Sequence, residues 1–460
     1  MSLFTSLYAA RSGLRAASSG IAVVSHNVAN AATEGFSRRR IVASTSEPVR
    51  LGNAWFGTGV SVKGVSRVTD QLIAERVVRI TGKEARATSS RDILSSLEKV
   101  AFDGSTGRSS ADLLSAFYDS MRRLSTDPSD RSLRAAMVTS GVALADNLNQ
   151  TSRSMTETLD GIVAELRATV DGIQEKLDKI ASLNRSVAQS GQSLGAGDFA
   201  DDRDQLIAEV AEELGATVDF TNEGQATLFV GGHAIVSGGV ARTLAIGGTP
   251  AAPTITVSAD RGVIDLTALA GGRFGGMMDA FNTTSGLLTD LNTFAADLAT
   301  NVNTQHTAGF DLNGVAGIDF FTVTAGTEGA SIAVDATIEA DPGLVAAAGA
   351  VPVGVGDGDN LALLIGLEDG LNFSGATVTG EDALADIFAE LGREVSTADL
   401  NSQALATEKS DLAELRESVS GVSLDEEATS LISWQAAYQA SSRVVTATNQ
   451  LLGELMEMVR

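Results

Sequence analysis

The side chains best suited to catalysis or metal binding are few in this 460-residue chain and lie far apart in the sequence. The chain has no cysteine and three histidines, His26, His233 and His306. No two histidines share a predicted helix at metal-ligand spacing, and no His-Glu-x-x-His segment occurs. Without thiolates or paired imidazoles, and with no nucleophile near a base, we expect no metal, no cofactor, no catalytic residue and no enzyme.

Two acidic loops, which begin at Asp311 and Asp357, faintly resemble calcium-binding loops. Neither has the full twelve-residue ligand spacing, and the first lacks Glu at the closing position. We therefore expect Asx turns, in which the carboxylate accepts hydrogen bonds from the backbone just ahead of it. The segments Gly57-Thr-Gly59 and Gly195-Ala-Gly197 do not complete the Gly-x-Gly-x-x-Gly pattern of a nucleotide site.

The basic triplet Arg38-Arg39-Arg40 has two interpretations. It could bind phosphate, or it could form ion pairs with carboxylates of the same assembly. The formal net charge is −25, although residues 1–91 carry 13 Lys and Arg against five Asp and Glu. An acidic body argues against nucleic acid and anionic membranes as partners, so we favour ion pairing.

The sequence gives no sign of membrane insertion or of a cleaved signal. Its most apolar run, residues 344–355, is short and contains Pro352, which is unsuited to a membrane span. The first ten residues contain no Lys or Arg, whereas a Sec-type signal begins with a basic segment. Both features fit a cytoplasmic chain, and equally one exported without cleavage.

The two chain ends carry apolar residues in alternating steps of four and three. This 3.5-residue period over four heptads is typical of a coiled coil. Only Ser441 and Thr448 interrupt it in the C-terminal stretch. An alternative is that each end is an ordinary helix docked on its own domain. We favour packing between axial subunits through these residues: Leu3, Leu7, Ala10, Leu14, Ala17, Ile21, Val24, Val28, Leu431, Trp434, Tyr438, Val445, Leu452, Leu455 and Val459.

Between the ends, helical and β-type patterns alternate. Apolar residues recur with helical spacing over residues 70–101, 109–124, 130–189, 201–214, 275–302 and 381–421. Short β-branched segments separated by Gly and Pro lie within residues 37–68, 216–257 and 311–380. The sequence therefore predicts an α+β fold with paired N- and C-terminal coiled-coil helices, a long helical-bundle middle domain and β-rich outer insertions.

We predict the following domains from these patterns. Residues 1–40 with 422–460 form a terminal coiled-coil domain, the inner axial domain. Residues 41–214, 271–310 and 381–421 form the helical middle domain. Residues 215–270 form a β-rich subdomain, and residues 311–380 a variable outer β-rich region.

Both ends resemble one family. The N-terminal segment from Asn27 to Arg38 resembles the motif shared by bacterial flagellar axial proteins of the rod, hook and hook-associated type. Its turn residues are Asn27, Asn30, Thr33, Gly35 and Phe36. Residues 421–444 resemble the matching C-terminal motif.

Three internal stretches resemble the hook-associated members of that family in particular. They are Asp127-Pro128-Ser129 with residues 134–138, residues 202–207, and residues 271–276 with 303–314. The resemblance covers roughly residues 1–310 and 385–460, whereas residues 315–380 match no family that we can name.

The resemblance implies a structural subunit of the extracellular flagellum that joins hook to filament and is required for filament assembly and motility. It implies secretion by the flagellar type III apparatus from the cytoplasm, without cleavage. The implied partners are further copies in a ring or helical assembly, the hook protein, the next hook-associated junction protein, and an export chaperone on the C-terminal region. We further predict that both ends are largely disordered in the free monomer. The alternatives are a hook or distal-rod subunit and, more remotely, a secreted adhesin or enzyme with helical export ends.

Overall fold

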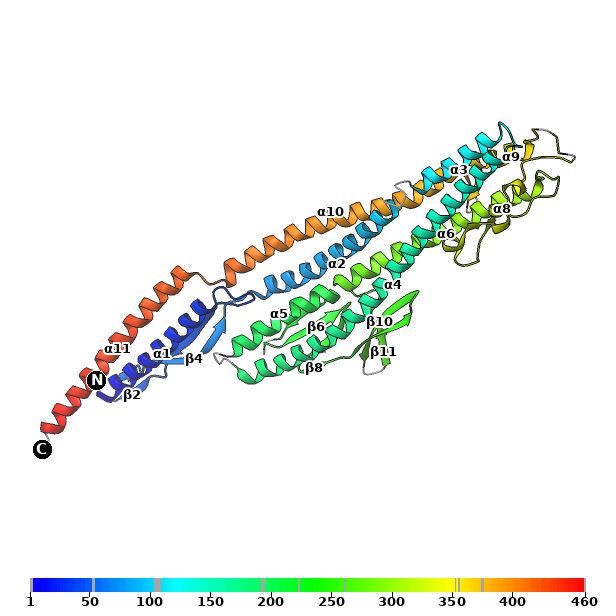
Figure 1. Ribbon diagram of the computed structural model, residues 1–460. Helices are drawn as coiled ribbons and strands as arrows, with labels where there is room; N and C mark the ends of the chain where they lie inside the picture. The colour runs from blue at the N-terminus through cyan, green and yellow to red at the C-terminus, as the bar shows by residue number, and fades with distance from the viewer. Residues whose placement is uncertain are drawn as a thin grey trace.

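The computed structural model is a long molecule with both chain ends at the same extremity (Figure 1). It describes residues 3–51, 54–102, 109–191, 195–221, 224–259, 262–351, 353–354, 356–373 and 376–458. Helix α1 (Leu3–Ala29) and helix α11 (Leu424–Met458) lie side by side at this extremity. Helices α8 (Ala336–Ala340) and α9 (Asp359–Gly366) lie near the other extremity.

A β-hairpin accompanies the terminal helices. Strand β1 (Arg39–Thr45) pairs antiparallel with β4 (Val60–Arg67), with a register shift after Val42. The smaller pair β2 (Val49–Leu51) and β3 (Ala54–Phe56) extends from its far end. Strands β1 and β4 contact α1. We call α1, β1–β4 and α11 the terminal unit. The sequence assigned β4 and all but the first two residues of β1 to the helical middle domain, whereas both strands contact α1.

Five long helices form the shaft of the molecule: α2 (Gln71–Phe102), α3 (Ser110–Leu124), α4 (Arg131–Ser190), α6 (Gly272–Ala308) and α10 (Gly380–Ser420). Helix α4 has 60 residues and a length of about 90 Å. Its start is fixed by Asp130, whose side chain accepts hydrogen bonds from the N–H groups of Ser132 and Leu133. Ser109 and Asp112 form a capping box at the start of α3.

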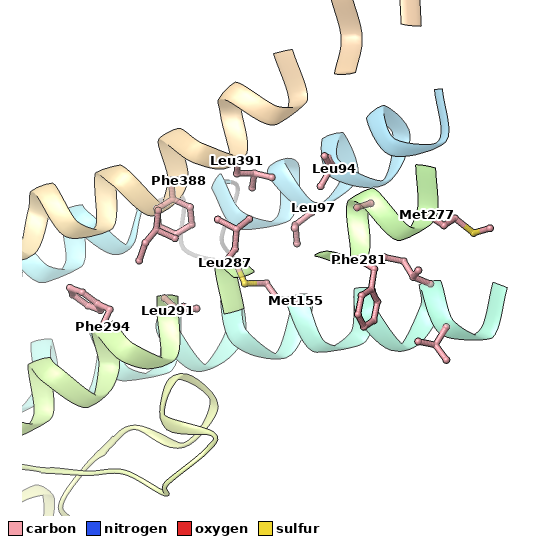
Figure 2. Close-up of a cluster of buried hydrophobic side chains, with 14 of the residues drawn as sticks. Leu94, Leu97, Met155, Met277, Phe281, Leu287, Leu291, Phe294, Phe388 and Leu391 are labelled. Atoms are coloured by element: carbon pink, nitrogen blue, oxygen red, sulfur yellow. The ribbon is translucent and has the colours of Figure 1, made fainter. Parts of the chain in front are cut away.

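The apolar faces of these helices meet in one continuous core. Figure 2 shows Leu94 and Leu97 of α2, Met155 of α4, and Phe388 and Leu391 of α10 around the aromatic and aliphatic side chains of α6. Glycines bring the backbones close together: a Cβ on Gly276 of α6 would lie 2.2 Å from the carbonyl oxygen of Arg86. The core therefore depends on small residues at helix crossings as well as on large apolar ones.

The region that the sequence predicted as a β-rich subdomain consists of two antiparallel sheets beside α4 and α5 (Ala196–Leu214). Asn184 of α4 is fully buried and binds the backbone N–H and C=O of Ala226 and the C=O of Gly238. The strands are β5 (Thr217–Phe220), β6 (Ala226–Val230), β7 (His233–Ser237) and β8 (Val240–Ala241) in one sheet, and β9 (Leu244–Thr249), β10 (Ala252–Ala259) and β11 (Gly262–Asp265) in the other.

Residues 311–380 contain less strand than the sequence indicated. The described strands are two short pairs, β12 (Phe321–Thr322) with β13 (Ala333–Val334) and β14 (Leu371–Phe373) with β15 (Ala376–Val378). The rest is loop and short helix: α7 (Glu328–Ser331), α8 (Ala336–Ala340), η1 (Pro342–Leu344), α9 (Asp359–Gly366) and η2 (Leu367–Asp369). The predicted fold class is confirmed: α+β, with paired terminal helices, a helical middle and small sheets.

Candidate assembly surface on the terminal helices

The two terminal helices run antiparallel and approach closely at two glycines of α1. A Cβ on Gly13 would lie 2.8 Å from Oγ of Ser441, and one on Gly20 would lie 2.4 Å from the indole of Trp434. About two helix turns beyond, Asn27 donates a hydrogen bond to Glu427. Since these pairs recur every seven residues, the two helices stay in a coiled-coil register along α1.

The apolar residues that the sequence assigned to subunit packing differ in burial. On α1, Ala10, Ala17 and Val24 are buried, whereas Val28 is exposed. On α11, Tyr438 and Leu455 are exposed, and Val459 lies outside the described residues. The others are half-buried: Leu3, Leu7, Leu14, Ile21, Leu431, Trp434, Val445 and Leu452.

Within one chain, α11 has little contact with anything except α1. Its buried described residues are Glu427 and Thr448. Large apolar side chains on both helices remain in water, including Tyr8 at 65% exposure and Ile432 at 67%. Several large apolar side chains exposed on one pair of helices are typical of an interaction site. The described contacts thus leave the terminal helices with uncovered faces suited to other subunits.

The turn after α1 is built from the residues of the family motif. Asn27 is buried and forms two hydrogen bonds, both at 3.0 Å, with the backbone of Arg39, the first residue of β1. Its amide nitrogen donates to the carbonyl oxygen of Arg39, and its amide oxygen accepts from the N–H of Arg39. Asn30 donates to the carbonyl oxygen of His26, and the N–H of Thr33 donates to that of Asn30.

Gly35 and Phe36 complete this turn. Gly35 has φ of 81°, a conformation that L-residues with side chains seldom adopt. The ring of Phe36 packs edge-on against His26 and lies 5.1 Å below the guanidinium of Arg39. The turn therefore reverses the chain so that the hairpin folds back on α1.

The basic triplet forms ion pairs within the chain. Arg38 binds Glu426 at 2.6 Å and Glu427 at 2.8 Å, which connects the turn to the start of α11. Burial alone would lower the pKa of Arg38, but its hydrogen bonds to both carboxylates outweigh this and raise it. Arg40 is exposed.

A buried ion-pair cluster joins the terminal unit to α5. Arg39 binds Asp198 at 2.6 Å and Asp201 at 3.0 Å, and Arg67 binds Asp201 and Asp204. Burial raises the pKa of Asp201 despite its two guanidinium partners. Burial acts in the same direction on the more exposed Asp198, but Arg39 and His26 outweigh it and lower the pKa of that carboxyl.

Sequence reasoning missed this cluster. The segment Asp202-Arg203-Asp204 resembles a family motif but predicts no contact. The predicted ion pairing of Arg39 names no partner residue. The signal was the charge asymmetry of the chain, because a basic N-terminal segment in an acidic protein must face carboxylates somewhere. An open cavity of about 810 Å³ lies beside the cluster, with Gln71, Lys409 and Arg416 also in its wall.

The remaining predicted chemistry can also be located. His306 is buried between the carbonyl oxygen of Ile318 and the N–H of Ala346, and Asp311 accepts from the N–H groups of Asn313 and Val315, as expected of an Asx turn. Among the described residues, no group of three or more His, Cys, Asp or Glu could hold a metal ion. In the same part of the chain, no helix is long and apolar enough to cross a membrane.

Three family models match this chain. Residues 94–321 match the flagellar hook-associated protein FlgK helical domain. Residues 417–458 match the flagellar basal body rod FlgEFG protein C-terminal model, and residues 7–36 match the flagella basal body rod protein model. Together the three matches cover more than half of the chain.

Whole-length relatives agree with these matches. Flagellar hook-associated protein 1 of Bacillus subtilis is 26% identical, over 99% of this chain and 98% of the relative. The protein of that name from Escherichia coli is 24% identical, over 98% of each chain. The chain belongs to the family of flagellar hook-associated protein 1. The predicted family is therefore confirmed.

A solved structure of this family supports the fold. The flagellar hook junction protein FlgK from Burkholderia pseudomallei aligns with a TM-score of 0.65 and 15% identity, over 75% of this chain and all of that one. The terminal helices, the turn motif and the long helical middle thus belong to a hook-associated protein.

Proposed function

We propose that this chain is a structural subunit of the bacterial flagellum that joins hook to filament and is required for filament assembly and motility. One observation carries the proposal: the ends, which match rod-protein models, form a helix pair with uncovered apolar faces, such as Tyr8 at 65% exposure. A stable monomer has no use for such faces, whereas a subunit packed among copies covers them. The residues that we assign to subunit packing are the fifteen of the predicted terminal heptads.

The arrangement in Figure 1 suggests how the layers of the assembly would form. The terminal unit lies at one extremity and would form the inner layer around the axis. The shaft of α2, α3, α4, α6 and α10 would form the next layer, with residues 311–380 furthest out. The exposed carboxylates of an acidic chain would then face solvent.

We infer that the chain is exported unfolded by the flagellar type III apparatus and becomes ordered on assembly. Support comes from the lack of cysteine and from the small share of α11 that one chain buries. Its partners would be further copies, the hook protein, the next hook-associated junction protein and a chaperone on the C-terminal region. Amide exchange on the free monomer tests the ordering: strong protection of residues 3–28 would contradict it.

Another axial position is a second candidate, because the family models that match the two chain ends are rod-protein models. A hook or distal-rod subunit would carry the same terminal helices. The match of residues 94–321 to the hook-associated helical domain favours the junction. A secreted adhesin or enzyme has no comparable observation in its favour.

The test is deletion of this gene, followed by motility assays and electron microscopy. We expect hooks without filaments, with flagellin released into the medium, and restoration when the chain is supplied from a plasmid. Loss of the hooks themselves would move the subunit down to the rod or hook. Normal filaments would contradict an axial role altogether.

A further inference from the structure

The outer face of α1 has a definite chemical order. Seven exposed residues follow steps of four and three and lie opposite the glycines that contact α11. Two aromatic residues come first, then two arginines, then small residues: Phe4, Tyr8, Arg11, Arg15, Ser18, Ala22 and Ser25. Helix α1 contains no Asp or Glu, so the charged residues of this face are all basic.

The far end of α11 has the complementary character. In the antiparallel register set by Gly13 with Ser441 and Gly20 with Trp434, Leu3 lies level with residue 451. The last residues of α11 therefore extend about 10 Å past the start of α1, and Figure 1 shows this overhang beyond the N-terminus.

This overhang is apolar and acidic. It exposes Leu455 at 47%, Met456 at 75% and Met458 at 82%. Glu454 and Glu457 are exposed as well, and residues 444–458 contain no Lys or Arg. Among the described residues, no ion pair involves Glu454, Glu457, Arg11 or Arg15.

One chain cannot bring the two surfaces together. By the same register, Arg15 lies level with residue 439 of α11 and on the opposite side of α1 from it. Glu454 is fifteen residues further along, about 22 Å away. An ion pair between Arg15 and Glu454 therefore requires two molecules.

We propose that Arg11 and Arg15 of one subunit bind Glu454 and Glu457 of a neighbouring copy, with Phe4 and Tyr8 packed on the apolar overhang. This contact joins two different surfaces of the same chain, which is the heterologous type that generates rings and helical assemblies. Charge complementarity fixes which surfaces meet, while the apolar contact supplies burial. The inference rests on the proposed function, since it specifies the subunit contact.

Disulfide trapping tests the contact directly, because the chain contains no cysteine. Chains carrying Arg15→Cys are mixed with chains carrying Glu454→Cys, assembled and oxidised mildly. We expect a mixed disulfide-linked dimer in several-fold higher yield than from the matched control, Ser25→Cys with Glu454→Cys. Equal yields in both mixtures, or linkage only between two Arg15→Cys chains, would overturn the proposal.

Charge exchange gives a second, independent test in cells. We expect Arg11→Glu with Arg15→Glu, or Glu454→Lys with Glu457→Lys, to prevent filament growth, and the variant carrying all four changes to regain it. Detection of each variant in the medium controls for export; for a variant that is not exported, the disulfide result decides. If the unaltered chain restores filaments and the two reversed variants do so too, the contact is wrong while the junction function stands. If the unaltered chain never enters flagella, the proposed function itself fails.

Discussion

The terminal unit and the shaft are both helical, yet they are stabilised in different ways. The continuous apolar core runs from Val78 to Leu391 and includes no residue of α1, β1–β4 or α11. The shaft buries large side chains such as Phe117 and Leu166 completely, whereas the most buried apolar positions of α1 are alanines and valines. Burial of apolar area is the main stabilising term in folding. The shaft therefore has a core of its own, while the terminal unit would gain further burial from neighbours in the proposed assembly.

The strongest way to break this contrast is to place charges at half-buried apolar positions of α1. Leu14→Asp combined with Ile21→Asp should abolish incorporation and motility, because a carboxylate at a covered apolar position loses its hydration. The shaft should keep its fold, since its core contains neither residue. Swimming assays and near-UV circular dichroism of the purified variant report the two effects separately.

The matched control is Leu363→Asp, which makes the same change at a leucine of α9 that is 60% exposed and far from the terminal unit, and it should permit swimming. If the double variant swims normally, the terminal helices do not pack as proposed. If its shaft unfolds, the independence of the two regions is lost.

A substitution in the core of the shaft should instead lower the stability of the shaft itself. Phe117 has no exposed surface and packs against the rings of Tyr118, Phe320 and Phe321. Phe117→Ala should lower the free energy of unfolding by about 3–5 kcal/mol, measured by urea denaturation of the free chain.

Tyr438→Ala on α11 sharpens the comparison. Tyr438 is 44% exposed in one chain, so its removal should change the unfolding free energy of the free chain by no more than about 0.5 kcal/mol. It should still reduce incorporation into flagella, because we assign Tyr438 to subunit packing. A cost equal to that of Phe117→Ala would show that α11 is already covered in the monomer.

The ion-pair cluster between the two regions gives an intermediate effect. Arg39→Ala leaves Asp201 with one guanidinium partner in a buried position, which should cost about 3 kcal/mol. The loss should appear as faster amide exchange in β1 and in the first turns of α5. The exposed neighbour is the control: Arg40→Ala should leave the exchange of both segments unchanged. Equal effects from the two variants would mean that the cluster does not hold the regions together.

The shaft and the terminal helices were predictable because their signals are local. The apolar spacing from Met155 to Val187 and the capping residue Asp130 specify α4 almost to the residue. The cluster at Arg39 was not predictable, since its partner Asp198 is 159 positions away and no periodicity connects them. The degree of exposure of Tyr438 and Leu455 was equally out of reach, because the proposed partners of these two residues belong to other subunits.

Residues 311–380 show a different reason why a prediction from the sequence was wrong. Their Gly, Asp and Val content indicated strands, but side-chain to backbone hydrogen bonds shape most of this region. Asn360 donates to the carbonyl oxygen of Ala346, and Arg134 of α4 donates to that of Val345. Burial lowers the pKa of Arg134 to about 10, so the group is still charged at neutral pH. Contacts of this kind leave no periodic trace in a sequence.

A pH-dependent effect is expected at His306, which connects α6 to the same region. Its Nδ1 lies 2.6 Å from the carbonyl oxygen of Ile318, and its Nε2 accepts from the N–H of Ala346. Because one nitrogen must accept, the ring is neutral in the folded chain. Burial, the larger cause, and the charge of Arg134 lower the pKa of His306. The unfolded chain therefore binds a proton more readily, and this part of the stability is lost as the pH falls through the unfolded pKa of about 6.5.

Urea unfolding at a pH of about 7.5 and about 5.5 measures this loss. At the higher pH, the His306→Gln variant should be less stable than the unaltered chain. The variant should also lose less unfolding free energy between the two pH values. The difference is about 1.4 kcal/mol for each pH unit that separates the folded and unfolded pKa values of His306. The unaltered chain, measured at the same two pH values, is the reference for this slope. An unchanged slope in His306→Gln would mean that this imidazole does not couple protonation to folding.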